Sequence, residues 1–133
     1  MHLKPELIDA DRRFTLGIIG LGNVGSRLAY MAELLGWKVL GHDPFVERSG
    51  IQQVSLNELF AQADAISIHV PLTYRGEYPT FHLIDAKALS EMKKTAILIN
   101  SARGSVVAEA DLMADIRATQ RQVVLDVFEH EPE

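Results

Sequence analysis

Short apolar runs alternate with amphipathic segments along the chain, and this alternation predicts strands followed by helices. The run TLGIIG at residues 15–20 is almost entirely apolar, as is typical of a strand buried on both faces of a parallel sheet. Similar runs predict four more strands, at residues 37–41, 65–70, 96–100 and 123–126. This order predicts an α/β fold, a single domain with a doubly wound parallel sheet.

The segments between these runs predict helices. Residues 24–35 predict a helix that Gly36 is suited to end. One apolar stripe, expected to face the core, recurs along it at spacings of four, three and four: Val24, Leu28, Met31 and Leu35. Further helices are expected after the capping pattern of Ser55 with Glu58, from Asp85 through Met92, and over residues 108–118.

Charge and composition exclude several classes of binding partner. The net charge is −5, from 13 Lys and Arg against 18 Asp and Glu, and no basic block could follow a nucleic-acid backbone. The chain has no cysteine, so disulfides and thiolate metal sites are excluded, and no metal site is expected. No apolar run is long enough to span a bilayer, and residues 1–14 lack the apolar centre of a secretory signal. We therefore expect a cytoplasmic protein without nucleic-acid or membrane partners.

A glycine-rich turn joins the first predicted strand to the first predicted helix. Its sequence GLGNVG places Gly20, Gly22 and Gly25 at the spacing of a dinucleotide-binding loop, in the strand-to-helix context that the motif requires. Such a loop presents its backbone and a helix N-terminus to a pyrophosphate, so Asn23 and Val24 are also candidate cofactor contacts. The pattern favours a Rossmann fold that binds NAD, although a glycine turn without a ligand is the alternative.

An acidic residue follows the second predicted strand. Asp43 lies 18 residues after Gly25, close to the spacing of about 20 expected for the acid that binds a ribose 2′-hydroxyl. Its carboxylate would repel a 2′-phosphate, so NAD is favoured over NADP. Because Asp43 precedes Pro44, a simple turn residue is the alternative.

Three later segments carry a family resemblance. ILINSARGSVV at residues 97–107, LDVFEHEP at 125–132 and HVPLT at 69–73 resemble signatures of the D-isomer-specific 2-hydroxyacid dehydrogenases. The resemblance implies an NAD-binding domain at residues 14–133 after a lead-in at 1–13. It also implies an oxidoreductase acting on a small 2-hydroxy acid, with homodimerisation possible.

The resemblance also assigns candidate site residues. Arg103 takes the position of the arginine that contacts the substrate carboxylate and carbonyl, where its planar guanidinium would orient a 2-keto acid. Glu131 takes the position of the glutamate that pairs with a catalytic histidine, and Asp126 that of the acid that receives the nicotinamide carboxamide. The remaining cofactor contacts implied are Val70, Ser101, Ala102 and Arg103.

The segment HVPLTYRGEYPTFHLID, residues 69–85, resembles one subfamily, the erythronate-4-phosphate dehydrogenases, and implies a role in pyridoxal phosphate biosynthesis. Tyr74, Arg75 and Tyr78 within it are expected to be solvated loop residues, with ligand or partner contact as the alternative. Within the wider family, a phosphoglycerate- or glyoxylate-type dehydrogenase stays open. From other classes, a single-domain NAD-sensing module and a methyltransferase-like domain binding S-adenosylmethionine are weaker alternatives.

Two features that the resemblance leads us to expect of a whole enzyme are not found in this sequence. The family's catalytic histidine follows the Glu-Pro segment, after the position of Glu133, and none of the five histidines here is a convincing substitute. The substrate domain of the family is not recognisable either. We therefore expect an excised cofactor domain that binds NAD and is inactive alone.

Overall fold

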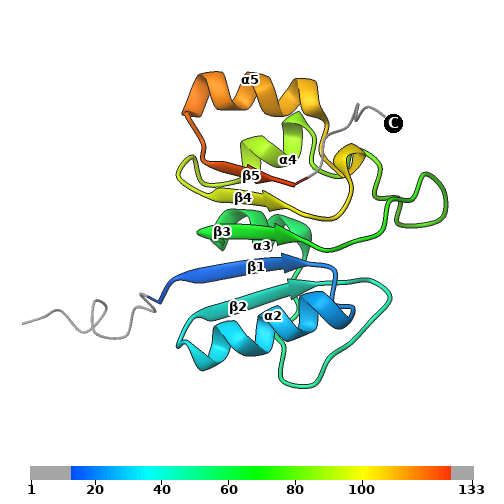
Figure 1. Ribbon diagram of the computed structural model, residues 1–133, viewed down its shortest axis with the longest axis vertical. Coiled ribbons are helices and arrows are strands. Elements are labelled where there is room, and N and C mark those ends of the chain that lie inside the picture. Colours follow the sequence, from blue (N-terminus) through cyan, green and yellow to red (C-terminus); the bar gives the residue numbers. More distant parts are fainter. Residues whose placement is uncertain (1–12, 127–133) are drawn as a thin grey trace, which may run out of the picture.

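Five parallel strands form the centre of the molecule. The computed structural model describes residues 13–126. The strands are β1 (Thr15–Ile19), β2 (Lys38–His42), β3 (Ala65–Ile68), β4 (Ile97–Asn100) and β5 (Val123–Leu125). They lie in the order β2-β1-β3-β4-β5 (Figure 1). Each strand begins and ends within two residues of its predicted range, and the predicted parallel α/β sheet is confirmed.

A short parallel bridge extends the sheet beyond β2, and the sequence analysis missed it. Gly41 pairs with Gln53. Gly41 N donates to Gln52 O at 2.8 Å, and Val54 N donates to Gly41 O at 2.9 Å. If this bridge is counted as a strand, the order across the sheet is bridge-β2-β1-β3-β4-β5. The first strand in the sequence is then central, the second and third lie on one side of it, and the last three lie on the other side. That is the order of dinucleotide-binding sheets, which bind ligands where the strand order reverses, here between β1 and β3.

Four α-helices and one 3₁₀ helix connect the strands: α2 (Asn23–Leu34), α3 (Leu56–Gln62), α4 (Ala86–Glu91), η1 (Gly104–Val106) and α5 (Glu109–Thr119). The predicted caps are present. Ser55 Oγ accepts from Glu58 N at 3.2 Å, and Asp85 Oδ1 accepts from Ala88 N at 2.9 Å. Gly36 has a φ of +85° just beyond α2, a conformation that favours glycine at the end of a helix.

Hydrophobic clusters cover both faces of the sheet. One cluster includes Leu59 of α3, Leu89 of α4 and Leu112 of α5. The other includes Ala29 and Ala32 of α2. Figure 1 shows α2 crossing one face, with α3 behind the sheet. The predicted doubly wound arrangement is therefore present.

The apolar stripe predicted to bury α2 against the core is wrong. Val24, Met31 and Leu35 are 67 %, 63 % and 68 % exposed, and Leu28 is only partly buried. The buried face of α2 consists instead of small residues: Gly25, Ser26, Ala29 and Ala32. Small side chains let the helix approach the sheet closely, as the glycine loop before it requires. The large apolar side chains consequently point outward.

Candidate functional site

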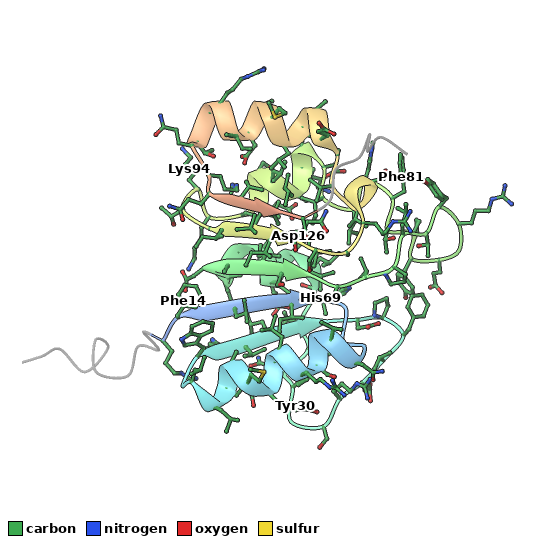
Figure 2. The ribbon with its side chains drawn as sticks, in the orientation of Figure 1. Phe14, Tyr30, His69, Phe81, Lys94 and Asp126 are labelled. Atoms are coloured by element: carbon green, nitrogen blue, oxygen red, sulfur yellow. The ribbon has the colours of Figure 1, made fainter. Side chains whose placement is uncertain are left out.

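The carboxyl ends of all five strands line up at one edge of the sheet. The last paired residues are Cα partners across the whole sheet, in the order His42, Ile19, Ile68, Asn100 and Leu125. The loops that follow these residues therefore share one edge, and every candidate site residue that the structure describes lies in one of these loops or in the first turn of α2. Figure 2 shows His69 and Asp126 near this edge, and Phe14 and Lys94 at the opposite one.

The glycines of the loop after β1 have different surroundings. Gly20 has a φ of +97°, and a Cβ there would lie 2.8 Å from the carbonyl carbon and oxygen of His69. A Cβ on Gly25 would collide with the carbonyl oxygen of Gly20. A Cβ on Gly22 would meet no protein atom within 4 Å. Gly20 and Gly25 are thus required by packing, whereas Gly22 faces open space.

The N-terminus of α2 borders that open space. Gly22 is the N-cap, it supplies no side-chain cap, and the first turn contains no acidic residue. Ser26 N donates to Gly22 O at 2.9 Å, so the N–H groups before it, at residues 23–25, precede the first intrahelical bond. Free backbone donors beside an open space fit a phosphate group. The residues present therefore fit the pyrophosphate of a dinucleotide.

Asp43 is held beside the glycine loop. Its Oδ2 accepts from Leu21 N at 2.8 Å, and its Oδ1 accepts from Phe45 N at 2.9 Å. Arg48 Nε donates to Leu21 O at 2.9 Å, which fixes the same loop from the other side. Each carboxylate oxygen keeps a lone pair for a further donor. Asp43 is therefore oriented and can still accept from a hydroxyl.

A cavity of about 650 Å³ opens beside the glycine loop. It brings together four predicted cofactor residues: Gly20, Gly22, Asp43 and Val70. Its wall also contains residues that the sequence analysis did not assign to a site, among them Phe45, Pro71 and Thr80. Arg75 and Tyr78, which were expected to be solvated loop residues, are exposed and line the cavity as well. The other described candidates do not line this cavity: residues 23–25 form the first turn of α2, and residues 101–103 and 126 lie farther along the edge.

The turn that carries Arg103 is organised by a buried asparagine. Asn100 is 1 % exposed. Its Oδ1 accepts from Ala102 N at 3.1 Å, and its Nδ2 donates to Arg103 O at 3.0 Å. The side chain of Arg103 is exposed at the edge of the sheet. Sequence reasoning missed Asn100 as the residue that positions this turn, although an asparagine that ends a buried strand was a usable signal.

His69 lies between the sheet and the cavity. Its Nε2 is 2.7 Å from Ser67 Oγ, and its backbone N donates to Ile19 O at 2.7 Å. Burial lowers the pKa of His69, because a desolvated imidazolium is disfavoured. His42 Nδ1 lies 2.9 Å from Val54 O. Both histidines therefore have partners within the protein.

One predicted site residue lies outside the described part of the chain. Metal sites and membrane-spanning helices were searched for only within that part. Glu131 falls outside residues 13–126. Between residues 13 and 126, no group of three or more His, Cys, Asp or Glu side chains could hold a metal ion. Of the helices in that range, none has the length and apolarity to cross a membrane.

Comparison with known proteins identifies relatives of this chain. The family model "D-isomer specific 2-hydroxyacid dehydrogenase, NAD binding domain" matches residues 6–133. Erythronate-4-phosphate dehydrogenase of Acinetobacter baumannii (strain SDF) is 61 % identical over 99 % of this chain and 37 % of the relative. The enzyme of the same name from Psychrobacter sp. (strain PRwf-1) is 54 % identical, again over 99 % and 37 %. The chain thus spans 37 % of the length of these curated relatives.

Solved structures agree with the sequence relatives. D-lactate dehydrogenase from Aquifex aeolicus, complexed with NAD and lactic acid, superposes with a TM-score of 0.79 at 41 % identity, over 87 % of this chain and 35 % of that one. A D-isomer specific 2-hydroxyacid dehydrogenase from Xanthobacter autotrophicus Py2, complexed with NADPH and MES, gives 0.81 at 31 % identity, over 90 % and 38 %. With the family model covering almost the whole chain, these matches show that it belongs to the D-isomer specific 2-hydroxyacid dehydrogenase family, as an NAD-binding domain.

Proposed function

We propose that this chain is the NAD-binding domain of an NAD-dependent oxidoreductase that acts on the CH–OH group of a D-2-hydroxy acid, 4-phospho-D-erythronate, in pyridoxal phosphate biosynthesis, and that the domain is inactive alone. The observation that carries the proposal is the strand edge, where the open space at Gly22, the N-terminus of α2 and Asp43 lie around one cavity. The substrate rests on the identity of 61 % to an erythronate-4-phosphate dehydrogenase. We further propose that residues 14–133 form one cofactor domain after a lead-in at 1–13.

Each group of predicted cofactor residues would bind a different part of NAD. The N–H groups at the start of α2, including those of Asn23 and Val24, would bind the pyrophosphate. Asp43 would accept from the adenosine ribose, and Val70 would border the base. Ser101, Ala102 and Asp126 lie farther along the same edge and would hold the nicotinamide half.

Arg103 would act on the substrate. Bound NAD supplies the hydride acceptor, the nicotinamide ring. The exposed guanidinium of Arg103, on a turn that Asn100 holds, would bind the substrate carboxylate and stabilise negative charge on the C2 oxygen as its proton leaves. Glu131 would keep the proton affinity of the acid/base histidine high by pairing with it.

The assembly and location that we propose follow from surface features. An exposed apolar face of α2, formed by Val24, Met31, Leu34 and Leu35, supports a homodimer in which this face packs against a second copy. The net charge of −5 supports a protein without nucleic-acid partners. We place it in the cytoplasm, without membrane attachment.

Calorimetric titration with NAD tests the cofactor proposal. We expect saturable binding to the 133-residue chain, and a loss of about 10- to 100-fold in Asp43→Ala, because a charge-assisted hydrogen bond to the ribose is removed. Asp43→Asn is included because it keeps one oxygen acceptor for the Leu21 N–H. Glu33→Ala, an exposed carboxylate toward the far end of α2, is the matched control and should bind NAD as the unmodified chain does.

Two results would count against this proposal. One is the absence of NAD binding, and the other is an equal affinity of Asp43→Ala and Glu33→Ala. Titration with NADP tests the predicted preference, since the Asp43 carboxylate would repel a 2′-phosphate. Substrate assays on the full-length enzyme that compare 4-phospho-D-erythronate with phosphoglycerate and glycolate would separate the proposed substrate from those of other family members.

A further inference from the structure

Residues 73–80 form an excursion after β3 whose two ends are bonded together. Thr73 N donates to Thr80 Oγ1 at 2.8 Å, and Thr80 N donates to Thr73 O at 3.0 Å. The Thr80 hydroxyl also donates to Pro71 O at 2.5 Å, and Thr80 is buried. Figure 1 shows this segment projecting beyond the edge where the strands end. Because its base is closed by these bonds, the tip has a defined position.

The tip contacts the opposite side of the cavity through two aromatic rings. Tyr78, in the excursion after β3, meets Phe45, which follows β2, with ring centroids 5.7 Å apart and an interplanar angle of 82°. This is the edge-to-face arrangement that aromatic pairs favour. Both residues line the cavity beside the glycine loop. The pair therefore connects the two sides of the cleft.

The second tyrosine of the excursion has other surroundings. Tyr74 packs against Phe81 at 5.0 Å between ring centroids, with an interplanar angle of 31°. It does not line the cavity. Tyr74 and Tyr78 are thus two exposed tyrosines of one segment, of which only Tyr78 is at the site.

The walls near this pair suit a flat apolar ring. Val70, Pro71 and Leu83 line the cavity, and Asp43 lies where the cavity meets the glycine loop. A cavity of about 650 Å³ is within the range of small-molecule sites. A heteroaromatic base stacks well on aromatic side chains.

We propose that Phe45 and Tyr78 form an aromatic clasp over the adenine end of the dinucleotide, and that Tyr78 thereby determines the affinity for adenine-containing ligands. This inference rests on the proposed function, since the base can reach the clasp only if the ribose lies at Asp43 and the pyrophosphate at α2. The clasp adds a contact that the glycine loop and Asp43 do not supply. It also gives residues 73–80 a role in binding.

Calorimetric titration of the 133-residue chain with NAD, and separately with adenosine monophosphate, tests the clasp. We expect Tyr78→Ala to bind both probes roughly tenfold more weakly, because one stacking partner is lost. Tyr78→Phe should keep the affinity, and the matched control Tyr74→Ala should leave it unchanged. Phe45→Ala should weaken both probes, and the double variant should lose less than the sum of the single losses, because the rings act as a pair.

The outcomes separate the clasp from the proposed function. If NAD binds normally to Tyr78→Ala, or if Tyr74→Ala loses as much, the clasp is wrong and the cofactor proposal stands. If the unmodified chain binds neither probe, both are wrong. If it binds adenosine monophosphate but not NAD, and Tyr78→Ala weakens that binding, the clasp is supported and the NAD proposal is contradicted. Should Tyr78→Ala fail to fold, Phe45→Ala takes its place: weaker binding of both probes supports the clasp, and unchanged binding contradicts it.

Discussion

The fold stabilises the neutral form of His69. The ring is half-buried, its Nε2 lies 2.7 Å from Ser67 Oγ, and burial lowers its pKa. The folded protein therefore binds this proton less readily than the unfolded chain, whose histidine pKa is about 6.5. The contribution of His69 to stability is fully present above that pH, and it is lost as the pH falls below it.

Urea unfolding at about pH 7.5 and about pH 5.5 checks this prediction. We expect the free energy of unfolding of the unmodified chain to fall between the two pH values by more than that of His69→Gln, which keeps a polar side chain without the titration. An equal fall in both proteins would contradict the assigned role of His69.

The roles of single residues were predictable only where a motif fixed them. GLGNVG located Gly20, Gly22 and Gly25, but the sequence could not show that Gly22 alone faces open space, since that depends on the loop from His69 packing against Gly20. Tyr74 and Tyr78 are equivalent in the sequence. The structure distinguishes them because the Thr73–Thr80 bonds set where the excursion points.

At the scale of elements, Arg121 connects α5 to the segment between α4 and β4 from within the protein. Its Nε donates to Asp115 Oδ2 at 2.7 Å, and its side chain is 1 % exposed. The guanidinium also donates to the carbonyl oxygens of Lys93 and Ala96, at 2.6 and 3.0 Å. These carbonyls lie in the connection between α4 and β4, so one side chain satisfies acceptors of that connection and of α5.

Arg121→Met should lower the free energy of unfolding by about 3–5 kcal/mol, because it leaves Asp115 without its buried partner. Denaturant unfolding measures the loss. The double variant Arg121→Met with Asp115→Leu is the control, and it should recover part of that loss since no unpaired charge remains. A loss below about 1 kcal/mol for the single variant would contradict a structural role for the pair.

The positions of the elements followed from the sequence, but the orientation of α2 did not. Buried parallel strands are nearly all apolar, so the runs at β1, β3 and β4 were unambiguous. Helix α2 has two faces without charge, one of small residues and one of large ones. The prediction took the large apolar residues as the buried face, whereas the structure buries the small ones. The bridge at Gln53 involves a single pair and therefore leaves no apolar run to detect.

At the scale of the whole molecule, the outward face of α2 leads to a prediction about assembly. If this face packs against a second copy, Met31→Glu with Leu35→Glu places charges within the interface and should shift the protein from dimer to monomer. Met113→Glu, at an exposed apolar position of α5, is the matched control and should remain dimeric. Sedimentation velocity measures both. A monomeric unmodified chain would contradict the proposed dimer.

The molecule as a whole places one open space, at Gly22, in front of the N-terminus of α2, and the proposed function requires a pyrophosphate to bind there. The most direct test is the NAD affinity of Gly22→Ala, measured by calorimetry beside its thermal unfolding. A Cβ there meets no protein atom, and the φ of −68° suits any residue, so we predict unchanged stability with NAD binding weakened by at least about tenfold. Unchanged affinity for NAD in a stable Gly22→Ala protein would contradict the proposed binding mode.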